Sequence, residues 1–409
     1  MQTHQILAVA ILFMGCSGPA TQPTTPATST VLPASEPPEP VATVVPAEIS
    51  VVAVRSVAAI RALPVLEPGQ FRVHMIDVGT GLSFLVQGSD FNLLYDAGSN
   101  DDFRGVSSTK SNSRVVAYLW AALGESGPKE CKPAGDTWPV WTGEEEKTIN
   151  HVVLSHPHKD HGILLDDVLK CFKAENVWDT GVINDTQFYQ EWWQAISEEV
   201  GVEVHTVADV WADRTANIHG KSITVEHAPW SQIDEGQVVE LGAEARFKVL
   251  HADAGAHHDP NQNTLVLRVD LGSASLLLTG DAESGGREAP SKPVGDIEKH
   301  LLENFARDID VDILQVGHHG SLTSSRMGFL LAVSPKMALL STGPTKYGSI
   351  VPPDQAVIDA LVEVGATVYS TDEHDKTGCP VVDRVGSQEK AGTAKERPGG
   401  CDNYVLDIR

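Results

Sequence analysis

Three histidines and one aspartate lie within six positions of the sequence, in the stretch SHPHKDHG at residues 155–162. Histidine is scarce in this chain, with 16 in 409 residues, so this crowding indicates a shared task. Imidazole suits zinc and neighbouring metals, and a carboxylate offsets part of the charge of the ion. On a loop after the predicted strand HVVLS, His156 and His158 can point to one ion while Asp160 and His161 point to another. A polar surface turn is the alternative.

One short loop cannot supply two complete sets of ligands, so further ligands must come from distant parts of the chain. LLLTGDAE ends a predicted strand with Asp281, and ILQVGHHGS ends another with His318 and His319. Side chains at strand ends are held by a rigid sheet, which suits precise placement of ligands. Asp281 can bridge two ions, although an N-cap for a following helix is the alternative. The three stretches predict a site for two divalent ions, zinc first and manganese second.

The segments around these residues alternate between short strands and amphipathic helices. FRVHMIDV, LSFLVQG and FNLLYDAG form a predicted meander before the histidine loop, and ARFKVLHA, TLVLRVDL and SLLLTGD form strands before Asp281. Helical periodicity marks SRVVAYLWAALG, TQFYQEWWQAISEEVG, DIEKHLLENFARD and PDQAVIDALVEVG. Strand clusters in both halves predict an α/β fold in which two sheets face each other with helices outside.

The composition argues against a general DNA-binding protein. The chain has 30 basic and 55 acidic residues, which give a formal charge of −25. A duplex-DNA binder needs a basic face for phosphate. Bound metal ions would supply a local positive charge in an active pocket instead. The sequence carries no P-loop or other sign of a nucleotide cofactor.

The first residues resemble an export signal. The apolar run from Ile6 to Met14 is too short for a membrane-spanning helix but fits the core of a signal peptide. FMGC resembles a bacterial lipobox with Cys16 as the lipid-bearing residue, and cleavage after Ala20 is the alternative. Residues 1–16 are therefore predicted as a signal peptide, and the Pro/Thr/Ala-rich residues 17–70 as a disordered tether. Residues 71–409 form the predicted domain, which a lipid anchor would hold at the cell envelope.

Four cysteines remain after Cys16, and none forms a C-x-x-C pair, which argues against a structural zinc cluster. In an exported protein an even number suggests two disulfides with three possible connectivities. Cys379 and Cys401 flank a polar loop in the C-terminal extension and are the most natural pair, which leaves Cys131 and Cys171. Four buried thiols are the alternative.

The order H-x-H-x-D-H, T-G-D, G-H-H-G-S resembles the metallo-β-lactamase superfamily. It is most similar to the branch with the extracellular domain of the ComEC/Rec2 competence proteins and the bacterial phosphorylcholine esterases. MIDVGTG, LLYDAG, NQNTLVLRV and PTKYG add to this resemblance, which covers about residues 71–378. The resemblance implies an αββα four-layer sandwich, two metal ions and hydrolysis.

The resemblance also implies roles for single residues. One ion would be held by His156 and His158, the other by Asp160, His161 and His318, with Asp281 as the bridge. Family analogy favours His318 over His319 as the ligand, and leaves His319 to contact a ligand or the substrate. Ser321 and Tyr347 are further candidates for such contacts, although Tyr347 can equally be a packed aromatic residue.

The sequence departs from the family pattern in three places. Superfamily lactamases have a third histidine before the bridging aspartate, whereas this branch usually has asparagine, which Asn263 matches. His251, His257 and His258 are alternatives for that position. Leu82 replaces the last aspartate of the family's DVGQGD, and YGSIVP replaces YGHP, so a histidine on the substrate side is missing. These departures affect the prediction of the substrate more than that of the metals.

The leading functional prediction is an exported, lipid-anchored phosphodiesterase or nuclease that uses a metal-bridging hydroxide. Asp160 and Asp281 would be its catalytic carboxylates, and its substrate would be nucleic acid outside the cell or a phosphorylated envelope component. Hydrolysis of a carboxyl-type bond, in a lactone or a β-lactam, is the second possibility. A non-catalytic envelope lipoprotein that keeps the fold is the third, and the complete set of ligands argues against it.

Overall fold

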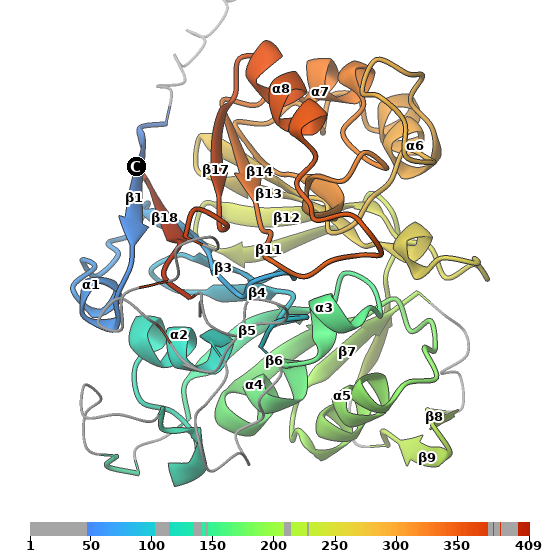
Figure 1. Cartoon of the computed structure of the whole chain (residues 1–409). Coiled ribbons are helices and arrows are strands. Elements are labelled where there is room, and N and C mark those ends of the chain that lie inside the picture. The colour runs from blue at the N-terminus through green and yellow to red at the C-terminus, as the bar shows by residue number, and fades with distance from the viewer. Residues whose placement is uncertain are drawn as a thin grey trace, which may run out of the picture. The chain divides into compact units, whose positions relative to one another are not determined.

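The computed structural model describes residues 47–102, 114–133, 141–143, 146–207, 214–226, 229–374, 379, 385 and 400–409. Two large sheets lie face to face in this part of the chain, and helices lie on their outer faces (Figure 1). In these same ranges, no helix has both the length and the apolar character needed to cross a membrane. The signal peptide and the lipidation of Cys16 fall outside them and stay predictions.

The first sheet contains nine strands in the described residues, antiparallel from β1 to β4 and parallel from β4 to β10. In spatial order the strands are β1 (Ile49–Val54), β18 (Asn403–Ile408), β2 (Phe71–Met75), β3 (Phe84–Gln87), β4 (Asn92–Tyr95), β5 (Thr148–Val153), β6 (Lys173–Trp178), β7 (Glu203–Thr206) and β10 (Trp230–Gln232).

The second sheet is antiparallel from β11 to β14 and parallel from β14 to β17. Its strands, in spatial order, are β11 (Val238–Gly242), β12 (Ala245–His251), β13 (Val266–Leu271), β14 (Ala274–Leu278), β15 (Ile313–Gln315), β16 (Met337–Leu340) and β17 (Thr367–Ser370). A separate hairpin pairs β8 (Thr215–Ile218) with β9 (Lys221–Thr224).

The helices divide between the two outer faces. Those packed with the first sheet are α1 (Val57–Arg61), α2 (Arg114–Leu123), α3 (Lys159–Gly162), α4 (Leu165–Cys171) and α5 (Gln187–Glu198). Those packed with the second sheet are α6 (Asp296–Asn304), α7 (Met327–Val333) and α8 (Gln355–Glu363). Short 3₁₀ turns are η1 (Lys129–Cys131), η3 (Pro260–Asn263) and η4 (Gly317–Gly320).

Three apolar cores separate the four layers. Phe84 and Leu276 belong to the core between the sheets, whereas their neighbours Leu85 and Leu277 pack in the cores under the two helical layers. Successive side chains of a strand point to opposite faces, so strands covered on both sides are apolar at every position. This arrangement confirms the predicted αββα four-layer sandwich.

The predicted boundary between tether and domain, at residue 70, is wrong. β1 and α1 both lie in the stretch assigned to the tether. β1 (ISVVAV) is apolar at five of its six positions, although Val54 is its only buried residue. It obtains its hydrogen bonds from β18, with Ile49 opposite Ile408 and Val54 opposite Asn403. A partner at the far end of the chain cannot be read from local periodicity.

The structure pairs Cys131 with Cys171 and Cys379 with Cys401. The first disulfide joins η1 to the end of α4, across a sequence separation of 40 residues. The second closes the C-terminal extension over 22 residues, directly before β18.

Acidification should destabilise the fold through His74 on β2. This histidine is fully buried, with Nδ1 2.9 Å from the Tyr118 hydroxyl and Nε2 2.7 Å from Gln87 Oε1. Burial lowers the pKa of His74 to about 3. Between its unfolded pKa of about 6.5 and this value, only the unfolded state binds the proton, so stability falls as the pH falls. At pH 4 the loss should be about 3 kcal/mol.

The measurement is urea unfolding of the wild type and of His74→Gln at pH 7 and pH 4. Burial raises the pKa of Asp179 to about 6 and of Glu298 to about 7, which favours the folded state on acidification. The difference between the two proteins isolates His74 from these opposing groups. The variant should lose less stability between the two pH values, and an equal loss in both proteins would contradict the assignment.

Candidate metal centre

The three stretches singled out in the sequence meet at one edge of the two sheets. His156 follows β5, Asp281 follows β14, and η4 with its two histidines follows β15. β5 runs parallel to its neighbours, and β14 and β15 are parallel to each other, so their carboxyl ends lie at common edges. Ligands that are far apart in the sequence are brought together there.

Asp281 lies at the centre of the cluster and is 3% exposed. Its Oδ1 is 3.2 Å from His161 Nε2 and 3.8 Å from His319 Nε2. Its Oδ2 is 3.9 Å from His156 Nε2 and 3.7 Å from His318 Nε2. Each oxygen therefore faces a different pair of histidines, as expected of a carboxylate between two cations. The helix-cap alternative is wrong, because the next helix, α6, has Gly295 at its N-cap.

The donor atoms of this cluster fit divalent metal ions. Two groups of side chains bring ligand atoms within 4.8 Å of one another: His156, His161 and Asp281, and Asp160, His161 and His319. His161 Nε2, Asp281 Oδ1 and His319 Nε2 are buried without a hydrogen-bond partner. Buried polar atoms are normally paired, so the convergence of these three atoms fits a bound cation.

His158 and His318 lie at the margins of these two groups. His158 Nδ1 is 3.0 Å from His156 Nε2, and its side chain is partly exposed. His318 Nδ1 lies 2.6 Å from Thr323 Oγ1 and 2.9 Å from Glu283 Oε1, which leaves Nε2 facing Asp281. His318 and His319 face different oxygens of Asp281, so both are candidate ligands, one on each side of this carboxylate.

The electrostatics of the cluster favour a positive charge. Burial opposes the shift, but Asp281 and Asp96 outweigh it and raise the pKa of His161 well above its usual value. Against burial, Asp281 and Glu283 likewise raise the pKa of His318 to about 9. The histidines in turn hold the pKa of Asp281 well below its usual range despite its burial. Opposite charge within a few ångströms of a site favours its charged form.

Asp96 orients His161 from behind. Its Oδ2 accepts a hydrogen bond from His161 Nδ1 at 2.7 Å, and the carboxylate also accepts bonds from the backbone and hydroxyl of Ser155 at 2.7 Å each. With a metal ion bound at Nε2, His161 would keep its remaining proton on Nδ1, where Asp96 accepts it. Metal-ligating histidines are commonly fixed by a carboxylate in this way.

The backbone of η4 is bent sharply to aim its two histidines. His318 and His319 both adopt left-handed conformations, with φ of 47° and 54°. His319 Nδ1 donates to the carbonyl of Ser341 at 2.9 Å, which turns Nε2 towards the cluster. Gly280 is left-handed too, and a Cβ there would lie 2.8 Å from Thr264 Cγ2. Such uncommon conformations concentrate at functional sites.

The side chain of Asn263 holds a neighbouring loop in place. Its Nδ2 donates to the carbonyls of Asp253 and Gly255, at 3.0 and 2.9 Å. His251 Nδ1 donates to the carbonyl of Thr264 at 2.6 Å. The two groups of ligand atoms described above do not contain the alternatives His251, His257 and His258. A contact between Asn263 and substrate stays a prediction.

Ser321 and Tyr347 both contact side chains of the cluster or their supports. Ser321 Oγ accepts bonds from Arg287 at 2.9 Å and from the hydroxyl of Thr323 at 3.1 Å, and Thr323 contacts His318. The Tyr347 hydroxyl donates a short bond to Asp160 Oδ2. Ser321 thus supports a histidine, and Tyr347 reaches the metal centre directly.

Three supporting residues were missed in the sequence: Asp96, Asn100 and Glu283. Asp96 lies in LLYDAG and Glu283 in LLLTGDAE, both of which are quoted for the resemblance or the metal site. A signal for Asp96 exists, because an acidic residue directly after an apolar strand is unusual unless it has a partner. Asn100 carries no such signal, because its partners lie 60 and 247 positions away.

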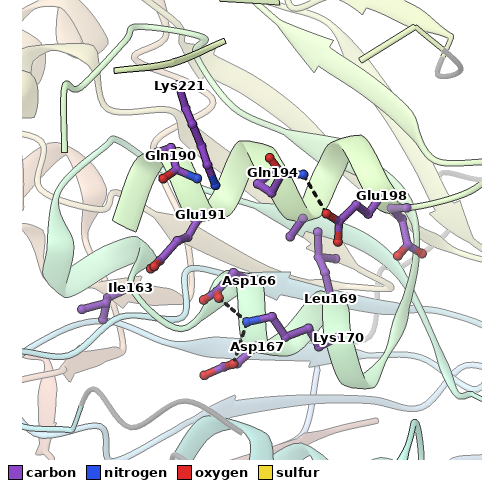
Figure 2. Close-up of a pocket in the computed structure, with 12 residues that line it drawn as sticks. Ile163, Asp166, Asp167, Leu169, Lys170, Gln190, Glu191, Gln194, Glu198 and Lys221 are labelled. Carbon is purple, nitrogen blue, oxygen red and sulfur yellow. Dashed lines mark hydrogen bonds and ion pairs between the residues drawn. The ribbon is translucent and has the colours of Figure 1, made fainter. Parts of the chain in front are cut away.

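A separate hollow of about 440 Å³ lies between α4 and α5 on the helical layer (Figure 2). Carboxylates line it, and Lys170 Nζ pairs with two of them, Asp166 at 2.6 Å and Asp167 at 3.2 Å (Figure 2). The side chains that line this hollow do not include the histidines of the metal cluster or Asp281. This hollow is therefore distinct from the metal cluster at the sheet edge.

The sequence matches the model of the Metallo-beta-lactamase superfamily over residues 76–343, more than half of the chain. It is 25% identical over 250 residues to ComE operon protein 3 of Bacillus subtilis, covering 61% of this chain and 27% of that protein. It is 24% identical over 304 residues to Recombination protein 2 of Haemophilus influenzae, covering 74% and 28%. The chain thus spans about a quarter of the length of these relatives.

The crystal structure of YhfI, a metallo-beta-lactamase fold protein from Bacillus subtilis, is similar over 74% of this chain and 97% of that one. The two have 14% sequence identity and a TM-score of 0.39. The family match spans the strands and loops that carry His156, His161, Asp281 and His319. The chain therefore belongs to the metallo-β-lactamase superfamily, and its similarity to ComE operon protein 3 and Recombination protein 2 agrees with the ComEC/Rec2-like resemblance seen in the sequence.

Proposed function

We propose that this chain is an exported, binuclear phosphodiesterase of the nuclease type. The observation that carries the proposal is the position of Asp281, whose two oxygens face two different pairs of histidines. Such a carboxylate is suited to two cations that act together on one phosphoryl group. A single cation would use only one side of it.

Each side of Asp281 would bind one ion. His156, His158 and His318 lie on the Oδ2 side, and Asp160, His161 and His319 lie on the Oδ1 side or beside it. When bound, two zinc or manganese ions would activate a water molecule and neutralise charge on the phosphoryl oxygens. No serine or cysteine nucleophile is required of the chain.

Asp160 would act as a ligand and an orienting group, not as a strong base. Although burial opposes the shift, His319 and His161 hold the pKa of Asp160 far below its usual value. It therefore stays ionised at neutral pH and accepts hydrogen bonds at Oδ2 from Asn100 and Tyr347. Asp160 is 8% exposed and Asp281 is 3% exposed, so Asp160 is the more accessible of the two carboxylates.

The family branch supports a phosphodiester substrate. Two curated relatives are named Competence protein ComA, of Neisseria gonorrhoeae, and Recombination protein 2, of Haemophilus influenzae. Both names suggest a role with nucleic acid. DNA or RNA outside the cell, or a phosphorylated component of the envelope, is the proposed substrate class. The lipid anchor at Cys16 would place the enzyme at the envelope.

A substrate screen tests the proposal. The purified chain, loaded with zinc or manganese, should contain close to two ions by elemental analysis and should hydrolyse bis-(p-nitrophenyl) phosphate, DNA or choline phosphodiesters. Lactones and nitrocefin serve as the competing carboxyl-type substrates. Turnover of these alone would replace the phosphodiesterase assignment, and no turnover of any substrate with two ions bound would support the non-catalytic alternative.

A further inference from the structure

Asn100 and Tyr347 meet beside the metal centre, at Oδ2 of Asp160. Asn100 Nδ2 donates to Asp160 Oδ2 at 2.9 Å, and the Tyr347 hydroxyl donates to the same atom. Asn100 Nδ2 also donates to the Tyr347 hydroxyl at 3.0 Å. Tyr347 is 38% exposed and Asn100 is partly exposed, so both face the solvent beside the ligand.

The two segments that carry these donors are tied to each other through Thr80. Its carbonyl accepts the backbone N–H of Asn100 at 2.7 Å, and its hydroxyl accepts the N–H of Thr345 at 2.9 Å. Asp101 accepts the N–H of Thr80 at 2.6 Å and the hydroxyl of Thr345 at 2.5 Å. Thr80 is fully buried, and Asp101 is 4% exposed. The donors are thus held in place before any substrate arrives.

A close backbone contact adds to this rigidity. A Cβ on Gly343 would lie 2.1 Å from the backbone nitrogen of Thr80, so only glycine allows the two segments to approach each other there. Tyr347 itself is fixed by two backbone hydrogen bonds with Ile350, at 2.8 and 3.1 Å. Preorganised donors stabilise charge without the cost of rearrangement when the reaction occurs.

We propose that the Asn100 amide and the Tyr347 hydroxyl form a donor pair that binds a non-bridging oxygen of the substrate's phosphodiester group beside Asp160. This inference rests on the proposed function and names the residues that would select its substrate. A carboxylate that binds a cation gives up part of its capacity to accept hydrogen bonds, so both donors, with their backbones fixed, become available to an incoming oxygen beside Asp160. Both are uncharged, which suits the single negative charge of a diester.

The test uses Tyr347→Phe and Asn100→Ala in the full chain loaded with zinc. Calorimetry should show that diethyl phosphate, an inert phosphodiester, binds about tenfold more weakly to each variant, a loss typical of one hydrogen bond to a charged group. KM for bis-(p-nitrophenyl) phosphate should rise by a similar factor. Zinc content should stay at the wild-type value. Tyr404→Phe and Asn304→Ala, which remove a hydroxyl bonded to Glu373 and an amide bonded to His300, should leave all three quantities unchanged.

Two results would overturn the donor pair. In one, both variants bind diethyl phosphate within about twofold of the wild type. In the other, zinc affinity falls while the zinc-saturated variants bind diethyl phosphate normally, which would make the two residues supports of Asp160 alone. If the wild type itself neither binds diethyl phosphate nor cleaves any phosphodiester, the proposed function fails, and the donor pair fails with it. Wild-type cleavage with unaffected variants rejects only the pair.

Discussion

Replacing Asp281 with asparagine should lower hydrolysis by about 100-fold or more, a scale typical of losing a key electrostatic group in an active site. Asparagine keeps the shape of the side chain but removes its charge and one strong acceptor. Because Oδ1 and Oδ2 face opposite pairs of histidines, the change should weaken both ions and not one. Metal ligation and the activation of water are coupled, so both losses should appear together.

Elemental analysis after dialysis and a steady-state assay measure these two losses. Far-UV circular dichroism should stay close to that of the wild type, because the three apolar cores do not include Asp281. Asp312→Asn is a matched control, since this carboxylate bonds to Ser275 and Lys336 on the second sheet and contacts none of the ligands given above. Full activity in Asp281→Asn with two ions retained would refute the role of Asp281 as the bridging carboxylate.

The candidate metal ligands could be identified in the sequence because their signal is local. His156, His158, Asp160 and His161 lie on one short stretch, and Asp281 comes soon after the end of the apolar strand β14. The fold class was predictable for a related reason, since strands buried on both faces carry apolar residues at every position. Hydrophobic periodicity and the order of the motifs were therefore sufficient to predict the four-layer fold.

The remainder depends on contacts between distant parts of the chain. β1 forms because β18 lies beside it, and Asp160 receives Tyr347 from 187 positions away. The two histidines of GHHG could not be distinguished in the sequence, because their difference lies in the left-handed backbone that turns one to each oxygen of Asp281. Family analogy favoured His318 alone, whereas the geometry brings His319 into a tight ligand group and keeps His318 close by.

Asp96→Asn should weaken metal binding at His161, because it changes which ring nitrogen of this histidine carries the proton. Asparagine tolerates the left-handed backbone of residue 96, where φ is 61°, so the fold should survive the change. With its oxygen at the Oδ1 position, it can still accept the backbone N–H of Ser155, which places the amide NH₂ at the Oδ2 position, facing His161 Nδ1 and Ser155 Oγ. An NH₂ donor there requires the histidine proton to move to Nε2, the atom that faces Asp281. His161 can then no longer offer a lone pair to a metal ion.

The expected result is a loss of about 10–100-fold in zinc affinity, the range found when partners of metal ligands are changed. Competition with a chromophoric chelator measures this affinity without relying on turnover. Ser155→Ala is the comparison variant: it removes one bond to Asp96 and a contact of 3.0 Å with His156 Nδ1 but leaves the carboxylate on His161 Nδ1, so its effect should be smaller. Equal zinc affinity in Asp96→Asn and the wild type would mean that His161 binds metal without help from Asp96. A larger loss in Ser155→Ala would mean that the hydroxyl, 3.3 Å from His161 Nδ1, sets the tautomer instead.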